Sequence, residues 1–200
     1  MALPIPPTIS PRVDCEKYKP EPRSATSGPK NGLSGSLAQI SWRCGLVGKS
    51  MPMALDEMKR AGITKAMVIG RRAQPPFENV PNEDVLSFVR DYPDNFFAVP
   101  ALEPTDRSAA LDELEFLHTQ PSVKAIHLEP GWAARPMYAD DANLYSIYER
   151  LEKIGMPTLV SAGGTIGPDF GYVDPKHLHR VAKDFPKLKL IIGHGGWPYG

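Results

Sequence analysis

The sequence predicts an α/β fold built from parallel strands, and it favours a (β/α)8 TIM barrel over a doubly wound sheet. Short apolar stretches alternate with amphipathic stretches of helical period. Five of the apolar stretches begin roughly 30 residues apart, and each is apolar at successive positions, as strands buried on both faces are. Polar residues follow every one of these stretches, which suits a barrel because all of its strand ends meet at one mouth.

The pattern divides the chain into two parts. Residues 1–45 are rich in proline, glycine and serine and have no apolar period, so they are predicted to be an irregular N-terminal segment. Residues 46–200 carry the repeating pattern and are predicted to form an incomplete barrel of about five to six βα units.

The helices are predicted from apolar residues spaced three and four apart. In residues 50–62 these positions form a single stripe, which a glycine ends. Ser50 and Ser108 stand at the starts of two such stretches and are predicted N-caps. The predicted helices are 50–62, 81–93, 108–120, 140–155 and 174–186.

The strands come between the helices, and their carboxyl ends carry the polar residues. The predicted strands are 64–70, 96–104, 123–131, 157–164 and 188–196. The polar residues that follow them are Arg71 and Arg72, Glu103, Glu129, residues 161–165 and His194. None of these strands is followed by GxGxxG or GxxxxGKS/T, so the sequence gives no support to a nucleotide site.

Strand alternation predicts which side chains enter the mouth of the barrel. In the third strand, Ile126 and Leu128 suit the outer face that packs against helices. Ala125, His127 and Glu129 are therefore predicted to point inward.

The fifth strand, LKLIIGHGG, ends in a histidine among glycines, which let backbone and substrate approach His194 closely. If His194 points inward, Leu190 and Ile192 join it and Ile191 faces the helices. A histidine and a carboxylate in a low-dielectric mouth shift each other's pKa toward neutrality, as general acid/base catalysis requires. His194 and Glu129 are therefore the predicted catalytic residues, and the alternative role of Glu129 is a hydrogen bond to a loop.

Five further residues are predicted to bind substrate. Arg71 or Arg72, placed over the mouth, suits a bidentate contact with a substrate carboxylate, and the alternative is a solvated pair. The alternative for His127 is a histidine hydrogen-bonded inside the barrel. Ser161 and Trp197 complete the set, and aromatic residues near the strand ends suit a flat or unsaturated substrate, although they also suit packing between loops.

Composition narrows the classes of partner. The chain has 23 basic and 23 acidic residues, so no net charge draws it to nucleic acid or to an anionic membrane. It has no secretory signal pattern and no stretch of ~20 apolar residues that could span a membrane. Cys15 and Cys44 do not form a CxxC pair and are interpreted as reduced thiols of a cytoplasmic protein.

Two stretches resemble a known family. They are LEPGWAARPMYADDANLYSIYERLEKIGMPTLVSAGGTIGPD, which begins at Leu128, and LIIGHGGWP, which begins at Leu190. Together they resemble the amidohydrolase-related (amidohydrolase 2) family of TIM barrels, which includes aminocarboxymuconate semialdehyde decarboxylase-like enzymes and small carboxylate hydrolases. The resemblance runs from about residue 50 to Gly200, is densest from Glu129 onward, and implies a barrel of the metal-dependent hydrolase type.

The resemblance also implies a set of site residues. The family pattern has a His-x-His pair on the first strand, a His ending the fifth, a His on the sixth and an Asp on the eighth, which together hold a divalent metal and activate water or a carboxylate. His194 matches the sixth-strand His, whose usual role is acid/base. Ser161 stands where the fifth-strand His is expected, and residues 1–42 contain no His-x-His pair. No residue is therefore predicted as a metal ligand, and the cofactor stays open, with zinc as the metal that the resemblance implies.

These observations predict a hydrolase that acts on a small carboxylate-bearing substrate, cyclic or unsaturated, by His-assisted acid/base chemistry. One alternative is a non-oxidative decarboxylase on the same scaffold, in which His194 protonates the carbon that loses CO2. Another is a catalytically silent barrel that binds a ligand or a partner, which the missing His-x-His pair and Ser161 suggest.

The pattern also carries an expectation about assembly. Against the family, roughly two βα units lie beyond Gly200, so we expect the chain to represent a partial form of a longer protein. An arc of five or six strands leaves unpaired edges, and we expect it to self-associate into a homo-oligomer.

Overall fold

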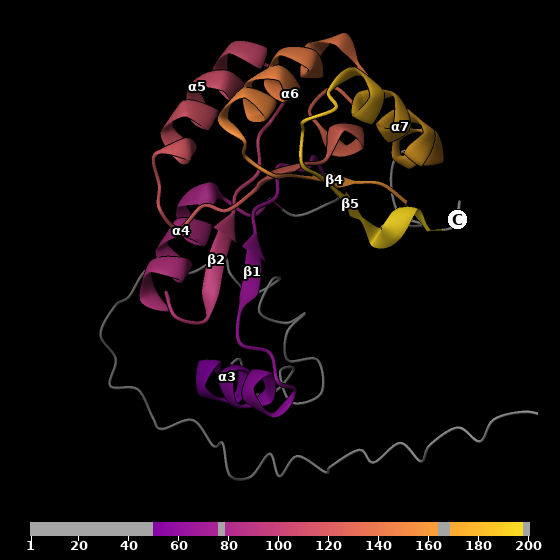
Figure 1. The fold of residues 1–200 in the computed structure, drawn as a ribbon. Coiled ribbons are helices and arrows are strands. Elements are labelled where there is room, and N and C mark those ends of the chain that lie inside the picture. The colour runs from indigo at the N-terminus through magenta and orange to yellow at the C-terminus, as the bar shows by residue number, and fades with distance from the viewer. Residues whose placement is uncertain (1–49, 76–78, 164–168, 198–200) are drawn as a thin grey trace, which may run out of the picture.

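The computed structural model describes residues 50–75, 79–163 and 169–197 (Figure 1). The predicted irregular segment, residues 1–45, lies outside the described residues. In the part of the chain that is described, no helix is both long enough and apolar enough to cross a membrane.

The five strands of the described residues pair in parallel, as predicted. Strand β1 pairs with β2, and β3, β4 and β5 form a second set in that order. The strands are β1 (Ala66–Ile69), β2 (Phe96–Val99), β3 (Ile126–Leu128), β4 (Thr158–Ser161) and β5 (Leu190–Gly193).

A bulge joins the two sets of strands into one. Ala98 pairs with Val123 and Ala101 pairs with His127, so two residues on the β2 side lie opposite three on the β3 side. Pro100 lies within this stretch and has no N–H to donate, although its carbonyl accepts from the His127 N–H at 2.8 Å. The spatial order of the strands is therefore the order of the sequence, β1 to β5.

This order decides between the two predicted architectures. A doubly wound sheet reverses its direction at a switch point, so its strand order departs from the sequence order. Here each strand lies beside its sequence neighbour, as in a barrel wall. The fold is an incomplete TIM barrel, as the sequence predicts.

The helices lie where they were predicted, with shifted starts. They are α3 (Met51–Arg60), α4 (Asn82–Asp91), α5 (Arg107–His118), α6 (Ala142–Ile154) and α7 (Pro175–Asp184). The predicted cap at Ser108 is wrong, because the Asp106 carboxylate accepts from the Ala109 N–H at 3.1 Å and α5 begins one residue earlier. Ser50 occupies the N-cap position of α3, but its side chain makes no capping hydrogen bond.

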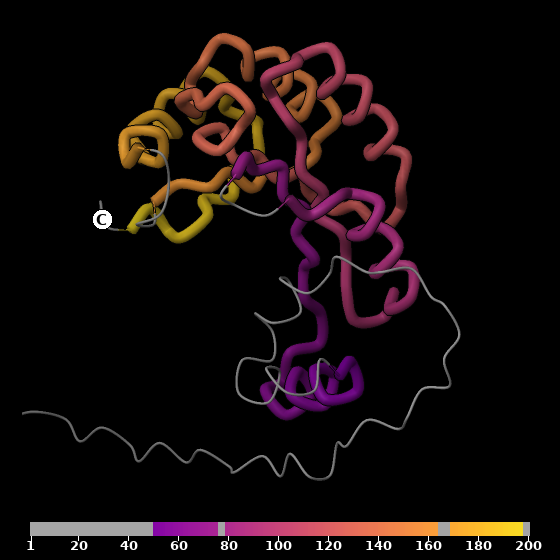
Figure 2. The backbone as a smooth tube through the Cα atoms, turned by 180° about the vertical axis from the view of Figure 1, so that it is seen from behind, coloured from indigo at the N-terminus to yellow at the C-terminus, as the bar shows by residue number. Residues whose placement is uncertain are grey.

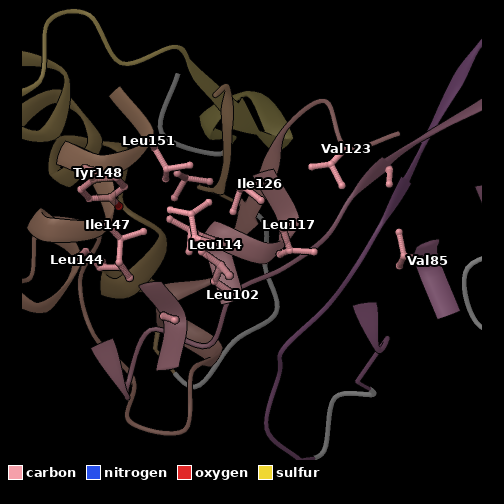
Figure 3. Close-up of a cluster of buried hydrophobic side chains, with 14 of the residues drawn as sticks. Val85, Leu102, Leu114, Leu117, Val123, Ile126, Leu144, Ile147, Tyr148 and Leu151 are labelled. Carbon is pink, nitrogen blue, oxygen red and sulfur yellow. The ribbon is translucent and has the colours of Figure 1, made fainter. Parts of the chain in front are cut away.

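Helices α4 to α7 form an arc around the outer side of the strands (Figures 1 and 2). The main core fills the space between this arc and the sheet, and Figure 3 shows its centre. Tyr148 is fully buried there, and its hydroxyl donates to the Ala139 carbonyl at 2.9 Å. Side chains from both layers build the core, among them Val85, Leu114, Leu117, Ile126, Leu144, Ile147 and Leu151.

A smaller apolar cluster covers the inner face of the sheet. Val99, Ala125 and Leu159 form it, with Ile69 and Phe97 packed against them. Ile126 and Leu128 belong instead to the core under the helices. The predicted phase of the third strand is therefore confirmed.

The predicted alternation of inward and outward side chains in the fifth strand is wrong by one residue. Ile191 pairs in register with the inward Leu159, whereas Leu190 packs against the outer core. Gly193, which pairs with Ser161, takes the last inward position. His194 lies beyond the strand in a 3-10 turn, η4 (His194–Gly196), so strand alternation does not set its direction.

Asn82 ties the start of α4 to the strand that follows it. Its amide pairs with both backbone groups of Ala101, accepting from the N–H and donating to the carbonyl, each at 2.8 Å. Gly70 lies against this pair, since a Cβ there would come within 2.7 Å of the Asn82 Oδ1 and 2.9 Å of the Ala101 N. Asn82 is 2% exposed, so its hydrogen bonds are shielded from water.

We predict that Asn82→Ala lowers the free energy of unfolding by about 1–3 kcal/mol, because it leaves the backbone groups of Ala101 buried without partners. Urea unfolding measures the change. The matched control is Asn143→Ala in the first turn of α6, where we expect a change within about 0.5 kcal/mol. Equal effects of the two substitutions would contradict this role for Asn82.

Candidate active site

Four polar side chains meet at the carboxyl ends of β1, β3 and β4. Arg71 follows β1, His127 lies in β3, Glu129 follows β3, and Ser161 ends β4. His127, Glu129 and Ser161 are all buried. The inward phase of their strands brings them to the same face, and hydrogen bonds join them into one network.

Arg71 and Glu129 form a bidentate ion pair across the end of β2. The Arg71 Nε donates to Glu129 Oε2 at 2.9 Å, and Nη2 donates to Oε1 at 3.2 Å. The inward residue of β2 at this level is Ala101, whose methyl group leaves room for the two long side chains to meet. The Glu129 side chain is 7% exposed and that of Arg71 is 34%, so the guanidinium compensates a buried carboxylate while part of it reaches solvent.

His127 is held by hydrogen bonds at both ring nitrogens. Nδ1 lies 2.8 Å from the Gly70 carbonyl oxygen, and Nε2 lies 3.2 Å from Ser161 Oγ. A carbonyl oxygen only accepts, so Nδ1 carries the hydrogen and the Nε2 of the neutral ring is an acceptor. Burial lowers the pKa of His127, while the nearby Glu129 carboxylate acts in the opposite direction.

His194 lies directly after β5, at the same end of the sheet. It is exposed, and although burial is the main cause of the lowered pKa of His127, an electrostatic effect of His194 acts in the same direction, so the two imidazoles are within electrostatic reach of each other. Its φ of 56° is in the left-handed region, which residues other than glycine adopt uncommonly, although histidine, asparagine and aspartate do so more often than the rest. Such conformations persist where the surrounding structure holds them, and they gather at functional sites.

The two predicted arginines point in different directions. Arg71 enters the network, but Arg72, one residue on, turns to the helix side and donates to Glu113 of α5 at 2.7 Å. Asn82 donates to the same carboxylate oxygen at 2.8 Å. Of the two, Arg71 is therefore the one that the structure brings to Glu129.

Trp197 and Glu103 belong to the loops beyond the strands. The Trp197 side chain is 60% exposed, while its backbone packs so closely on Gly163 that a Cβ there would come within 2.3 Å of the Trp197 carbonyl oxygen. The Glu103 carboxylate accepts from the backbone N–H groups of Thr105 and Ala134, and so joins the loop after β2 to the loop after β3.

One part of the network was missed by the sequence analysis. The Gly70 carbonyl sets the tautomer of His127 across 57 residues of sequence. Backbone groups leave no mark in a residue pattern, so only the position of Gly70 at a strand end could have pointed to it.

The comparisons place the chain in a family. Residues 48–200 match the family model described as Amidohydrolase. The chain belongs to the amidohydrolase family. Among curated proteins, no sequence matches it significantly.

Solved structures of related barrels agree with the fold. An uncharacterized TIM-barrel protein, Bb4693 from Bordetella bronchiseptica, is 36% identical, with a TM-score of 0.70 over 76% of this chain and 53% of that one. The 4-oxalomesaconate hydratase LigJ from Rhodopseudomonas palustris is 25% identical, with a TM-score of 0.56 over 74% of this chain and 48% of that one. The 5-carboxyvanillate decarboxylase LigW from Sphingomonas paucimobilis is 18% identical, with a TM-score of 0.55 over 79% and 55%. The chain thus spans about half the length of these three proteins.

The amidohydrolase resemblance implies a divalent metal, which binds through nitrogen, sulfur or oxygen lone pairs that no other group occupies. Both ring nitrogens of His127 are hydrogen-bonded, and both oxygens of Glu129 hold Arg71. Among residues 50–75, 79–163 and 169–197, no three His, Cys, Asp or Glu side chains form a group that could hold a metal. The described residues therefore do not fit a divalent metal.

We predict that His127 makes the fold less stable in mild acid. Because the pKa of His127 is lower in the folded chain than its ordinary value of 6.5, the unfolded chain binds the proton first as the pH falls. Its contribution is therefore fully present above pH 6.5 and is lost as the pH falls from there through the lowered pKa.

Urea unfolding from about pH 8 to about pH 5 measures this dependence. We expect His127→Gln to flatten the slope below pH 6.5, whereas the control His179→Gln, at an exposed position of α7, leaves it unchanged. An unchanged slope in His127→Gln would contradict the assignment.

Proposed function

We propose that the chain carries the acid/base half of an enzyme that hydrolyses a small carboxylate-bearing substrate, cyclic or unsaturated. The observation that supports this most is the pair of hydrogen bonds at His127, in which Nδ1 contacts the Gly70 carbonyl at 2.8 Å and Nε2, the acceptor nitrogen of the neutral ring, contacts Ser161 Oγ at 3.2 Å. A buried imidazole with a lowered pKa is neutral near pH 7, so it is ready to accept a proton from an attacking water.

In this proposal His194 is the general acid. His194 is exposed at the same end of the sheet, where it can exchange protons with solvent and donate one to the leaving group. A buried base and an exposed acid give two histidines different roles in one site. Glu129 orients Arg71 and Ser161 and balances the positive charge that His127 gains.

The substrate class follows from the charges at the mouth and from the similar proteins. The partly exposed Arg71 guanidinium suits a substrate carboxylate, and Trp197, also exposed, suits a flat ring or conjugated chain. The names of the hydratase and the decarboxylase above also specify unsaturated or aromatic carboxylates. Hydration of an unsaturated acid also takes one proton from water and delivers one, but to carbon instead of to a leaving group.

Decarboxylation is the second candidate, favoured by the likeness to a decarboxylase fold. It needs a proton delivered to carbon, which is the role that the sequence predicts for His194 in this alternative. Arg71 would again hold the substrate. The predicted cytoplasmic location, self-association, and absence of nucleic-acid and membrane partners stay predictions.

The products decide between the two reactions. The full chain is incubated with cyclic esters of polycarboxylic acids and, separately, with hydroxybenzoic acids. The released carboxylate and CO2 are both measured. We expect new carboxylate without CO2. Release of CO2 would favour the decarboxylase, and no product from any member of the set would support the silent barrel.

We predict that His194→Asn lowers kcat by about 10²–10⁴-fold, because it removes the proton donor. Asparagine tolerates the left-handed conformation of residue 194, so the turn is kept. His179→Asn on α7 is the matched control and leaves kcat unchanged. Full activity in His194→Asn would exclude His194 from the chemistry.

A further inference from the structure

Ser161 has one hydrogen and two acceptors for it. Its Oγ lies 3.2 Å from His127 Nε2 and 3.4 Å from Glu129 Oε1. A hydroxyl donates only once at a time, so at any moment it donates to one of the two. Which of them receives the hydrogen depends on whether His127 Nε2 is itself an acceptor or a donor.

The neutral state of His127 fixes one arrangement. Gly70 offers only a carbonyl, so Nδ1–H donates to it and Nε2 must accept. Ser161 then donates to Nε2. Glu129 stays a carboxylate, with its Oε1 and Oε2 held by Arg71.

The protonated state fixes the opposite arrangement. Both ring nitrogens of the imidazolium now donate, Nδ1 to Gly70 and Nε2 to Ser161 Oγ. The Ser161 hydroxyl then no longer donates to Nε2 and can turn its hydrogen toward Glu129 Oε1, which Arg71 Nη2 holds in place at 3.2 Å. Every donor has an acceptor in both states, so the network can hold either one without an unpaired buried group.

We propose that Ser161 is a proton relay, which passes a proton from the attacking water to His127 and then turns its hydroxyl to Glu129. This rests on the proposed function. The water O–H bond breaks as a new Ser161 O–H bond forms, while the original Ser161 hydrogen moves to His127 Nε2. The hydroxide attacks the substrate carbonyl carbon, the bond to the leaving group breaks, and His194 gives that group its proton.

The relay explains why a buried base can act at all. His127 is 6% exposed, and its Nε2 is hydrogen-bonded to Ser161, the last residue of β4, so in this proposal the proton reaches Nε2 through the Ser161 hydroxyl. The charged and titratable groups that face His127 are Glu129, Arg71 and His194. Of these three groups only Glu129 favours the protonated ring. Ser161 Oγ lies between them, within hydrogen-bond distance of both Glu129 Oε1 and His127 Nε2.

Nitrogen-15 NMR of the full chain, labelled at histidine, tests the relay without any substrate. We expect neutral His127 to be the Nδ1–H tautomer in the unaltered chain. In Ser161→Ala the pKa of His127 should fall further, because the charge-assisted hydrogen bond that the imidazolium Nε2–H loses is stronger than the one that the neutral ring loses. Ser161→Thr keeps the hydroxyl and should restore the original pKa.

The resonances of His118 and His179 report whether each variant is folded, since both histidines are exposed. An Nε2–H tautomer in the unaltered chain would overturn the relay even if Ser161→Ala fails to fold. An unchanged His127 pKa in a folded Ser161→Ala would overturn it as well.

Kinetics separates this inference from the proposed function. With a substrate that the chain hydrolyses, the dependence of kcat on deuterium content should be curved in the unaltered chain and in Ser161→Thr, because two protons move together, and linear in Ser161→Ala. Absence of hydrolysis alongside the expected NMR behaviour would overturn the proposed function and the proton transfer from water, but it would support the two hydrogen-bond arrangements of Ser161. A linear dependence in the unaltered chain would overturn the relay and leave the hydrolase standing.

Discussion

The candidate site depends on a single electrostatic constraint, the pairing of the buried Glu129 carboxylate with Arg71. A carboxylate so far removed from water is costly unless a charged partner with good geometry compensates it. The bidentate contact supplies that partner and fixes both carboxylate oxygens. Ser161 can then hydrogen-bond to a fixed Oε1, and the position of Ser161 sets what His127 Nε2 contacts.

Small residues make this convergence sterically feasible. Ala101 leaves space for the ion pair to cross β2, and Gly70 brings its carbonyl to the imidazole while its Cα lies against Asn82. Gly193 occupies the inward position beside Ser161, where a Cβ would come within 3.1 Å of the Val160 carbonyl oxygen. The barrel wall thus places long polar side chains on β1 and β3 and keeps the positions between and beside them small.

Local periodicity was enough to predict much of this arrangement. Alternation along β3 correctly assigned Ala125, His127 and Glu129 to one face, because a short central strand follows the period of two without interruption. It failed where the backbone departs from that period. The strand β5 ends in Gly193, and the turn at His194 breaks the alternation on which the predicted phase depended.

Contacts between distant segments were out of reach of the sequence. Arg71 and Arg72 are adjacent residues of the same type, and only the pairing of β1 with β2 decides which of them contacts Glu129. The bulge between β2 and β3, like the Gly70 carbonyl, involves backbone groups, which a residue pattern does not specify. The roles of His194, Trp197 and Ser161 in binding or catalysis stay predictions.

A double-mutant cycle on Arg71 and Glu129 tests most directly whether the network is one coupled unit. Arg71→Gln, Glu129→Gln and the double variant are compared by urea unfolding. Because each single variant leaves a charge without its partner, the sum of the single effects should exceed the effect of the double variant by about 1 kcal/mol or more, after allowing for the partial exposure of Arg71. Additive effects would mean that the pair does not organise the site, and the account of Ser161 and His127 would lose its basis.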